Sequence, residues 1–325
     1  MAKAFRFYRA GKPDVLRWED VTLGKPGKGE ALLTHKAIGL NYIDTYFRAG
    51  LYPLPAFPSG LGVEGAGIVE AVGRNVKHIK KGDRVAYALG PLGAYSEQRI
   101  MPADVLIKLP RAISFEQGAA MMLKGMTAQY LVRRTYPIKK GETILWHAAA
   151  GGVGLIACQW AKRLGAKVIG TVGSDAKAKI AKRHGASYVI NYTREDVVKR
   201  VKEITKGQGV PVVYDSVGRT TFSQSLDCLA PLGTMVLFGQ SSGPVEPFNP
   251  AILGAKGSVY LTRPGLAHYT ATRADLEATA KDLFKVVTSK AVKIEINQTF
   301  PLKDAAKAHR ELEGRKTTGS TVLIP

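Results

Sequence analysis

The chain has 325 residues, of which 45% are hydrophobic and 22% charged, which indicates a globular protein of two domains and excludes a disordered or fibrous chain. Its two cysteines, Cys158 and Cys228, are too few for a disulfide framework or a cysteine-rich zinc site, and they fit the reducing cytoplasm. The formal net charge of +21 is spread along the chain without an arginine-rich tail, which favours a soluble surface over one dedicated to nucleic acid.

The first 125 residues have the pattern of short strands with glycine and proline between them. The clearest candidates are 30–40 (EALLTHKAIGL), 65–73 (GAGIVEAVG) and 83–90 (DRVAYALG). This pattern predicts a small, partly open β-barrel.

Between residues 126 and 262, apolar strands alternate with amphipathic helices. The expected strands are 143–147, 167–172, 188–192, 211–217, 234–239 and 258–263. The expected helices are 153–165, 175–185, 194–207 and 220–233. Strands that are apolar throughout and joined by helices predict a parallel sheet covered on both faces, which makes a doubly wound dinucleotide-binding domain of α/β class.

The tail of the chain should return to the first domain. It contains an expected helix over 271–289, a strand over 292–300, a helix over 302–314 and a last strand over 320–325. Because a single terminal strand cannot form a sheet alone, we expect it to join the barrel. The predicted domains are therefore 1–125 with 263–325, and 126–262.

A glycine-rich turn marks the expected cofactor site. Residues 143–161 carry no charge and could be taken for a membrane span, but the glycines at their centre favour a strand, a turn and a helix. Within the segment Ala149-Ala150-Gly151-Gly152-Val153-Gly154, Gly151 would let the backbone approach a pyrophosphate, and Gly154 would let the helix pack closely. The amides at the helix start favour phosphate.

The end of the second strand of this domain indicates which dinucleotide binds. Sites for NAD place an acidic residue there, whereas here the strand ends at Val172 and continues into Gly173 and Ser174. Lys177 and Tyr192 complete a pocket suited to a 2′-phosphate, which predicts NADPH. Asp175 is an acidic residue that argues against this prediction, but its position suggests a helix N-cap.

Several segments resemble the quinone oxidoreductases, the zeta-crystallin-like, zinc-free branch of the medium-chain dehydrogenase/reductase superfamily. The resemblance is carried by Gly141-Glu142, Leu145, AAGGVG, Gln159 and Lys162, by AIGLNYIDTYFRAGLYP and PSGLGVEGAGIVEAVG, and by SGPVEPFNPAIL, YLTRPGL and TTGSTVLIP. It covers essentially the whole chain and implies a Rossmann domain combined with a GroES-like barrel. Where the zinc enzymes of the superfamily have metal ligands, this chain has Asn41 with Asp44, and Val63, so no metal is expected.

The resemblance also implies which residues contact the cofactor. Those expected near the nicotinamide, in a cleft between the domains, are Asn41, Ile43, Asp44, Tyr46, Thr127 and Tyr130. Those expected at the phosphates and adenosine are Gly152, Val153, Gly173, Ser174, Lys177 and Tyr192, beside Gly151 and Gly154 of the glycine-rich turn. Those expected on the other side are Ser216, Phe238, Gly239, Gln240, Ser241, Arg263 and Pro264.

The expected reaction is NADPH-dependent reduction of a quinone without a metal, because the flat electrophilic acceptor needs mainly orientation in a dry site. Asn41, Tyr46 and Tyr52 are the candidates for hydrogen bonding to its oxygen, and whether any of them is a general acid stays open. So does the choice between one-electron and two-electron transfer.

Two alternatives remain. One is reduction of an activated double bond, as in 2-alkenal and enone reductases, and the other is an RNA-binding or structural, crystallin-like role. No aromatic cluster among basic residues supports RNA as more than a side activity. The resemblance also implies a homodimer that pairs through the cofactor domain, and the apolar segment SVYLTR is the expected edge strand.

Overall fold

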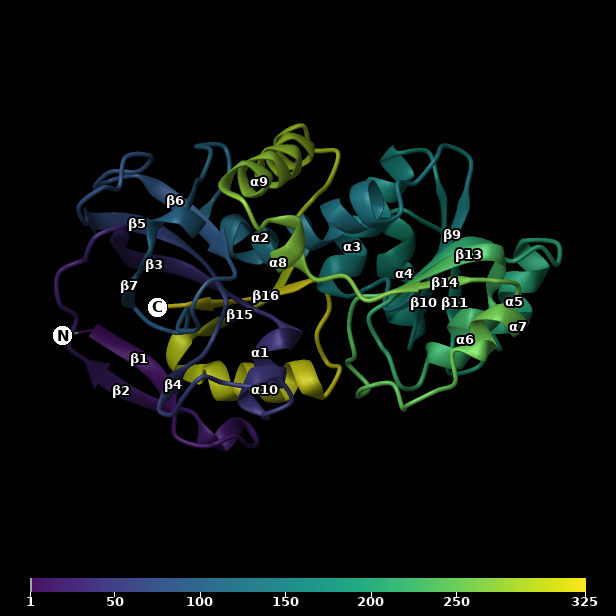
Figure 1. Ribbon diagram of the computed structural model, residues 1–325, viewed down its shortest axis with the longest axis horizontal. Coiled ribbons are helices and arrows are strands. Elements are labelled where there is room, and N and C mark those ends of the chain that lie inside the picture. Colours follow the sequence, from purple (N-terminus) through teal and green to yellow (C-terminus); the bar gives the residue numbers. More distant parts are fainter. Residues whose placement is uncertain (1) are drawn as a thin grey trace. The chain divides into compact units, whose positions relative to one another are not determined.

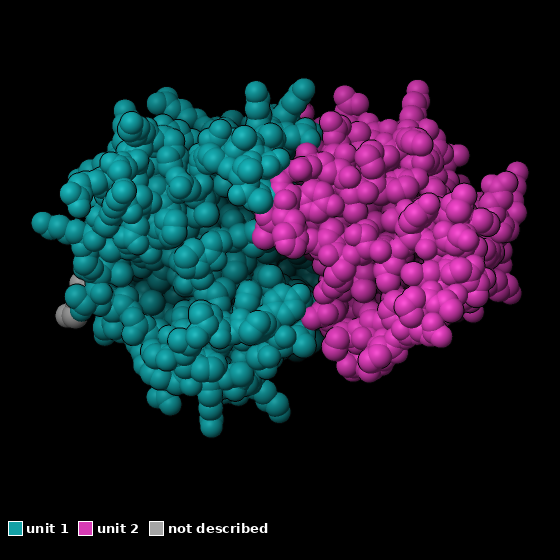
Figure 2. All heavy atoms as spheres, viewed as in Figure 1, with its two compact units in different colours: residues 1–126, 270–288, 294–325 teal, residues 127–269, 289–293 magenta. Residues whose placement is uncertain are grey.

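The computed structural model describes residues 2–325, which form two compact units (Figure 2). The first holds residues up to 126 together with 270–288 and 294–325, and the second holds 127–269 and 289–293. These limits lie near the predicted domain boundaries, although 263–269 and 289–293 pack with the second unit. The boundaries as such stay a prediction.

The first unit is built on a seven-stranded sheet in the order β15-β16-β3-β5-β6-β8, with β7 also paired to β3 (Figure 1). Its strands are β3 (Glu30–Leu40), β5 (Glu64–Val72), β6 (Arg84–Ala88), β7 (Gln98–Pro102), β8 (Ile107–Lys108), β15 (Ile296–Pro301) and β16 (Ser320–Ile324). A three-stranded sheet joins β2 (Arg17–Val21), β1 (Ala2–Phe7) and β4 (Ser59–Gly60). Buried apolar side chains such as Phe7, Leu33 and Tyr95 fill the space they enclose. The partly open barrel is confirmed.

The last strand returns to this sheet as expected. Leu323 of β16 lies opposite Ile38 of β3 in an antiparallel pair, and β15 pairs with β16 in parallel. The helices assigned to this unit are α1 (Tyr42–Arg48), most of α2 (Phe115–Tyr130), α9 (Arg273–Thr288) and α10 (Ala305–Glu313). Helix α2 was not predicted from the sequence, and its residues run across the expected boundary at 125.

The second unit contains a six-stranded sheet in the order β11-β10-β9-β12-β13-β14, and every pair in it is parallel. Its strands are β9 (Thr143–Trp146), β10 (Lys167–Val172), β11 (Ala186–Asn191), β12 (Val210–Asp215), β13 (Leu229–Leu237) and β14 (Tyr260–Thr262). Its helices are α3 (Gly152–Arg163), α4 (Asp175–Arg183), α5 (Val197–Ile204), α6 (Phe222–Asp227), α7 (Ala251–Ala255) and α8 (Leu266–Tyr269). Helices α3 and α4 contact β10 and β11, whereas α6 contacts β12 and β13 and packs beside α5 (Figure 1). The doubly wound Rossmann architecture is confirmed.

Several element boundaries were predicted wrongly. The expected helix over 220–233 ends at Asp227, because Leu229–Leu237 pairs with β12 instead. The register of that pair shifts near Leu232, which adopts a positive φ of 60°, so pairing within the sheet outweighs the helical pattern. The strand expected from residue 292 begins only at Ile296.

The uncharged segment 143–161 forms β9, the glycine turn and most of α3, as predicted. None of the helices in residues 2–325 combines the length and the apolar character that crossing a bilayer requires.

Candidate functional site

The glycine-rich turn connects β9 to α3. Ala148 has a positive φ of 54°, and Gly151 is the N-cap of α3. A Cβ atom on Gly154 would lie 2.5 Å from the carbonyl oxygen of Ala148, a distance that no side chain tolerates. Gly152 and Val153 occupy the first helical positions, where backbone N–H groups have no partner within the helix. The turn thus brings a close-packed helix and free amide donors together, as an anion site requires.

The residues expected at a 2′-phosphate are neighbours in the structure. Ser174 is the N-cap of α4, and its Oγ accepts a hydrogen bond of 3.3 Å from the backbone N–H of Lys177. The hydroxyl of Tyr192 lies 2.5 Å from the point where Gly173 would carry a Cβ atom, so only glycine lets this ring occupy its place. With 47% of its surface exposed, Tyr192 is accessible to a ligand.

The expectation that Asp175 is a helix N-cap is wrong, because Ser174 takes that position and Asp175 is the first helical residue. Both carboxylate oxygens of Asp175 are engaged by the guanidinium of Arg194, at 2.7 and 2.9 Å, and Asn191 Nδ2 donates to one of them at 3.1 Å. Arg194 was not among the residues predicted from the sequence. The register of β10 and β11 places Val172 opposite Asn191, so the residues just beyond the two strands meet. The pairing with Arg194 weakens the case for Asp175 as the acid of an NAD site.

The remaining candidates of the second unit lie just beyond the carboxyl ends of β12, β13 and β14. The Arg263 guanidinium donates to the carbonyl oxygen of Leu237 at 3.0 Å and to Gln240 Oε1 at 3.1 Å. A Cβ on Gly239 would lie 2.6 Å from the Ser216 carbonyl oxygen, and Ser241 N donates to that oxygen at 3.1 Å. Two further candidates follow the same strands, Phe238 after β13 and Pro264 after β14. Ligands of open α/β sheets bind at this edge.

Thr127 and Tyr130 lie in the last turn of α2, which continues into a π-helical turn over Leu131–Thr135. The Tyr130 ring stacks on that of Tyr269, with centroids 4.3 Å apart. Burial raises the pKa of the Tyr130 phenol, and Tyr269 adds to the shift. Tyr130 is only 2% exposed, so most of its ring serves packing within the second unit.

In the first unit, Asn41 is held by a buried carboxylate. Its Nδ2 donates to Glu64 Oε2 at 2.7 Å and, more weakly, to the carbonyl oxygen of Gly39 at 3.4 Å. Glu64 also accepts from the backbone N–H of Leu123 at 2.7 Å and pairs with Lys124 at 3.4 Å. With its amide hydrogens directed at protein oxygens, Asn41 presents an acceptor, whereas a quinone oxygen needs a donor. The arrangement therefore favours the tyrosines over Asn41 as donors.

Asp44 is fully buried and acts as the third residue of α1. Its Oδ2 accepts from the backbone N–H of Asn41 and from the Tyr95 hydroxyl, both at 2.9 Å, while Oδ1 has no partner among the described residues. Burial raises the pKa of Asp44 to about 7. Without exposed surface, this side chain supports Asn41 and α1 rather than touching a ligand directly.

Three tyrosines line one region of the first unit. The Tyr46 ring lies 5.3 Å from that of Tyr52 and 6.0 Å from that of Tyr42, measured between centroids. The backbone N–H of Tyr52 donates to the carbonyl oxygen of Tyr46, which fixes the loop to the helix. Ile43 is half-buried on the same helix. Tyr42 was not among the predicted site residues, although its position four residues before Tyr46 gives the spacing of one helical face.

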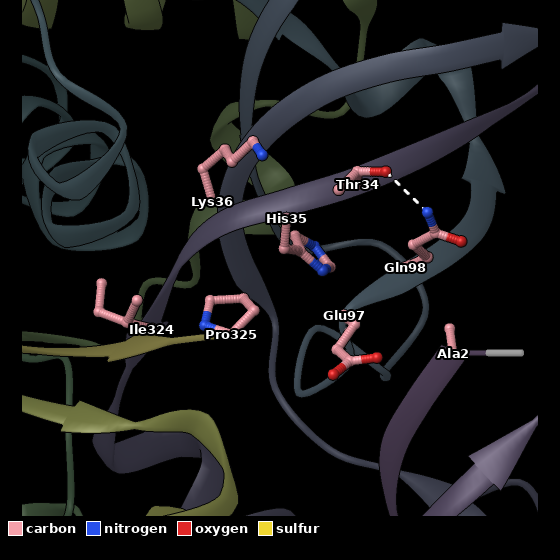
Figure 3. A pocket seen from close by; sticks show the side chains of 8 residues that line it. All are labelled: Ala2, Thr34, His35, Lys36, Glu97, Gln98, Ile324 and Pro325. Atoms are coloured by element: carbon pink, nitrogen blue, oxygen red, sulfur yellow. Dashed lines mark hydrogen bonds between the residues drawn. The ribbon is translucent and has the colours of Figure 1, made fainter.

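A separate cavity of about 430 Å³ lies in the first unit (Figure 3). Its lining residues are Ala2, Thr34, His35, Lys36, Glu97, Gln98, Ile324 and Pro325. Gln98 Nε2 donates to Thr34 Oγ1 at 3.0 Å across one wall. No candidate site residue lines this cavity.

Across residues 2–325, no group of three or more histidine, cysteine or acidic side chains is arranged to hold a metal ion. Cys158 and Cys228 are buried free thiols, and burial raises the pKa of each to about 12.

Comparison with known proteins gives consistent relatives. An alcohol dehydrogenase GroES-like domain model matches residues 27–111, and a zinc-binding dehydrogenase model matches 152–282. The chain is 56% identical to a quinone oxidoreductase of Pseudomonas aeruginosa, with both chains covered completely. It is 55% identical to Escherichia coli quinone oxidoreductase, solved in complex with NADPH, at a TM-score of 0.98 and full coverage of both chains. A 2-haloacrylate reductase of Burkholderia is 45% identical over 100% of this chain and 99% of that protein.

Proposed function

The chain belongs to the quinone oxidoreductases of the medium-chain dehydrogenase/reductase superfamily, and from this membership we propose that it reduces quinones with NADPH. The observation that carries the choice of cofactor is the end of β10, where Gly173, Ser174, Lys177 and Tyr192 meet. The carboxylate of Asp175, at the start of α4, is paired with Arg194.

The second unit fits a dinucleotide. Gly151 and Gly154 keep the turn clear of side chains, so the amides of Gly152 and Val153 would hold the pyrophosphate. Lys177 and Tyr192 would hold the 2′-phosphate. When bound, NADPH supplies the reducing equivalents for the quinone.

The side chains of the first unit would orient the acceptor. Tyr46 and Tyr52 offer hydroxyl donors and aromatic faces to a flat ring. Asn41, fixed by Glu64, offers a carbonyl oxygen that suits an N–H donor such as a nicotinamide carboxamide. The contacts of these residues with cofactor or quinone are part of the proposal.

Independence from zinc is also proposed, although one matching family model is described as a zinc-binding dehydrogenase. Asn41 and Val63 stand where the zinc enzymes have ligands, and a valine side chain has no donor atom for a metal.

Oxidation of NADPH across a panel of quinones, enals and alcohols, each with and without a chelator, tests the proposal. We expect quinones to be reduced fastest and the chelator to change nothing. Activity on alcohols that requires added zinc would contradict the assignment.

A second candidate is reduction of an activated carbon–carbon double bond. The observation that favours it is the 2-haloacrylate reductase, which matches the whole chain at 45% identity. The enal arm of the same panel decides between the two, because it measures turnover of a double bond with the same cofactor.

We further propose a homodimer and a cytoplasmic location. Strand β14 ends the sheet of the second unit, and Tyr260 on it is 61% exposed, so a second copy could extend the sheet at this edge. Two buried free thiols fit a reducing compartment.

A further inference from the structure

A chain of buried hydrogen bonds starts at His147, the residue between β9 and the glycine-rich turn. His147 is 1% exposed. Its Nδ1 lies 3.0 Å from Thr171 Oγ1 on β10, and its Nε2 lies 3.0 Å from Ser225 Oγ on α6, 78 residues further along the chain. One imidazole therefore connects the ends of two strands to a helix.

The chain continues to Asp215 at the end of β12. Asp215 Oδ2 accepts from Ser225 Oγ at 2.8 Å and from Thr221 Oγ1 at 2.7 Å. Its Oδ1 accepts from the backbone N–H groups of Val217 and Gly218, at 2.7 and 3.1 Å. The loop after β12 is thereby tied to the same network.

The contacts of Ser225 fix the direction of two of these hydrogen bonds. The carboxylate of Asp215 only accepts, so the Ser225 hydroxyl donates to it and must accept from His147 Nε2–H. In the neutral imidazole, the form that burial favours, Nδ1 then accepts from the Thr171 hydroxyl. Burial lowers the pKa of His147, and the charge of Asp215 offsets only part of this shift.

The residue types are those of a hydrolytic triad, but the arrangement is not. In a triad the acid orients the histidine, which accepts the serine proton. Here Asp215 takes the Ser225 hydrogen, His147 donates to the serine, and Ser225 has no exposed surface. The network therefore holds structure and does not attack a substrate.

What it holds is the turn that carries the phosphate-binding amides. The backbone N–H of Ala149 donates to the Thr171 carbonyl oxygen at 3.1 Å, while the Thr171 side chain bonds His147. Between His147 and Ala149 stands Ala148, whose positive φ of 54° is unfavourable for a residue with a Cβ atom. Such a conformation persists only where its surroundings fix it from both sides.

We propose that His147 is a positioning residue for the pyrophosphate of the cofactor, through Thr171, Ser225 and Asp215, an inference that rests on the proposed function. A fixed turn presents the amides of Gly152 and Val153 without ordering them at the moment of binding. Because NADPH and NADH share the pyrophosphate, the network acts on both alike, unlike Lys177.

Three substitutions test this inference: His147→Leu, Thr171→Val and Ser225→Ala. The matched control is His35→Leu in the first unit, a buried histidine that also makes two hydrogen bonds, to the Ser96 carbonyl oxygen and to Tyr87. Dissociation constants for NADPH and NADH are measured by nicotinamide fluorescence, melting by circular dichroism, and kcat with 1,4-benzoquinone at saturating NADPH.

We expect each substitution to raise the dissociation constants for NADPH and NADH by the same factor, roughly tenfold, because each removes one or two buried hydrogen bonds of the network. The value of kcat should stay near that of the wild type. The control should lose thermal stability without weaker binding. This pattern separates positioning from stability, because a purely structural role would make the three variants behave like the control, with lower thermal stability and unchanged binding.

Three results would overturn the inference. The first is wild-type binding by Ser225→Ala and Thr171→Val. The second is equal weakening of binding by the His35 control, and the third is loss of fold in all three variants, which would assign the network to stability alone. Binding of NADPH by the wild-type protein is measured before that of any variant. If the wild type does not bind NADPH, the proposed function itself is contradicted.

Discussion

The charge of Lys177 lies where it can distinguish NADPH from NADH, which lacks the 2′-phosphate. It lies in the first turn of α4, and its backbone N–H bonds the side chain of Ser174, so the start of its side chain is fixed. The Tyr192 ring packed on Gly173 forms the neighbouring wall.

Lys177→Ala should raise the Michaelis constant for NADPH more than tenfold and leave that for NADH nearly unchanged. The reason is that a charge-assisted hydrogen bond to a phosphate contributes roughly 1.5–3 kcal/mol, and NADH has no such phosphate. Steady-state kinetics with both cofactors measure the effect. Repeating them at raised salt separates the close pair from the diffuse attraction of a chain with a net charge of +21. Equal weakening of both cofactors would show that Lys177 contributes only to that general field.

Asp44 gives a second prediction at this scale, which concerns stability. Its pKa is raised by burial to about 7, so between pH 4 and 7 the folded protein binds a proton that the unfolded chain has released. This group therefore makes the free energy of unfolding fall as the pH rises through that window. Asp44→Asn removes this titration. The free energy of unfolding of the variant, relative to that of the wild type, should therefore rise with pH, by up to a few kcal/mol. Urea denaturation at pH 4.5, 5.5, 6.5 and 7.5 measures it, and a difference that does not change with pH would contradict the burial argument.

Elements set by local pattern were predictable, whereas side-chain contacts between residues far apart in the chain were not. The alternation of β9, α3 and β10 follows from periodicity and glycine placement. The contact of His147 with Ser225 joins residues 78 apart, and the contact of Arg48 with His309 joins residues 261 apart, so neither leaves a local signal. The helix predicted to end at 233 ends at Asp227 for the same reason, because the following residues pair with β12.

The same reasoning applies to the candidate site. The glycine turn and the pocket at Lys177 follow from motif and strand order, since parallel strands bring their carboxyl ends to one edge. The orientation of Asn41 does not, because it depends on Glu64, which β5 places beside it. Whether Asn41 can donate to a quinone was therefore open in the sequence, and the hydrogen bonds to Glu64 and Gly39 favour an acceptor.

Strand β14 carries the prediction at the scale of elements. Tyr260→Lys places a charge on the exposed edge, and a two-fold axis would bring two such charges together if two copies pair there. We expect light scattering to shift from dimer towards monomer at micromolar concentration. The circular dichroism spectrum should stay unchanged, because Tyr260 is 61% exposed in the single chain. A variant that stays as dimeric as the wild type would exclude this edge as the interface.

At the scale of the whole molecule, buried neutral histidines control the response to acid. Three histidines have almost no exposed surface. His35 and His309 lie in the first unit, and His147 lies in the second. Burial lowers the pKa of His35 and of His309 to about 3, with Arg99 and Arg48 as respective secondary causes. Each ring is fixed by two hydrogen bonds, which at His309 join Arg48 and Tyr95.

The last prediction follows from the sign of these shifts. Above about pH 6.5 both the folded and the unfolded chain keep these histidines neutral, so they cause no change of stability with pH. As the pH falls from 6.5 towards 3, the unfolded chain binds protons that the folded chain cannot, and the free energy of unfolding decreases. His309→Gln should therefore be less stable than the wild type at pH 7.5, because it loses contacts with Arg48 and Tyr95, yet it should lose less on acidification. The measurement is urea denaturation from pH 7.5 to 4.5, with the exposed His268→Gln as the matched control, which should keep the slope of the wild type. Since acid also raises the positive charge of a chain that already carries +21, the series is repeated at high salt, where self-repulsion is screened and the titration of buried histidines is not. An acid slope that salt abolishes in the wild type, or that His309→Gln leaves unchanged, would assign the acid sensitivity to net charge instead.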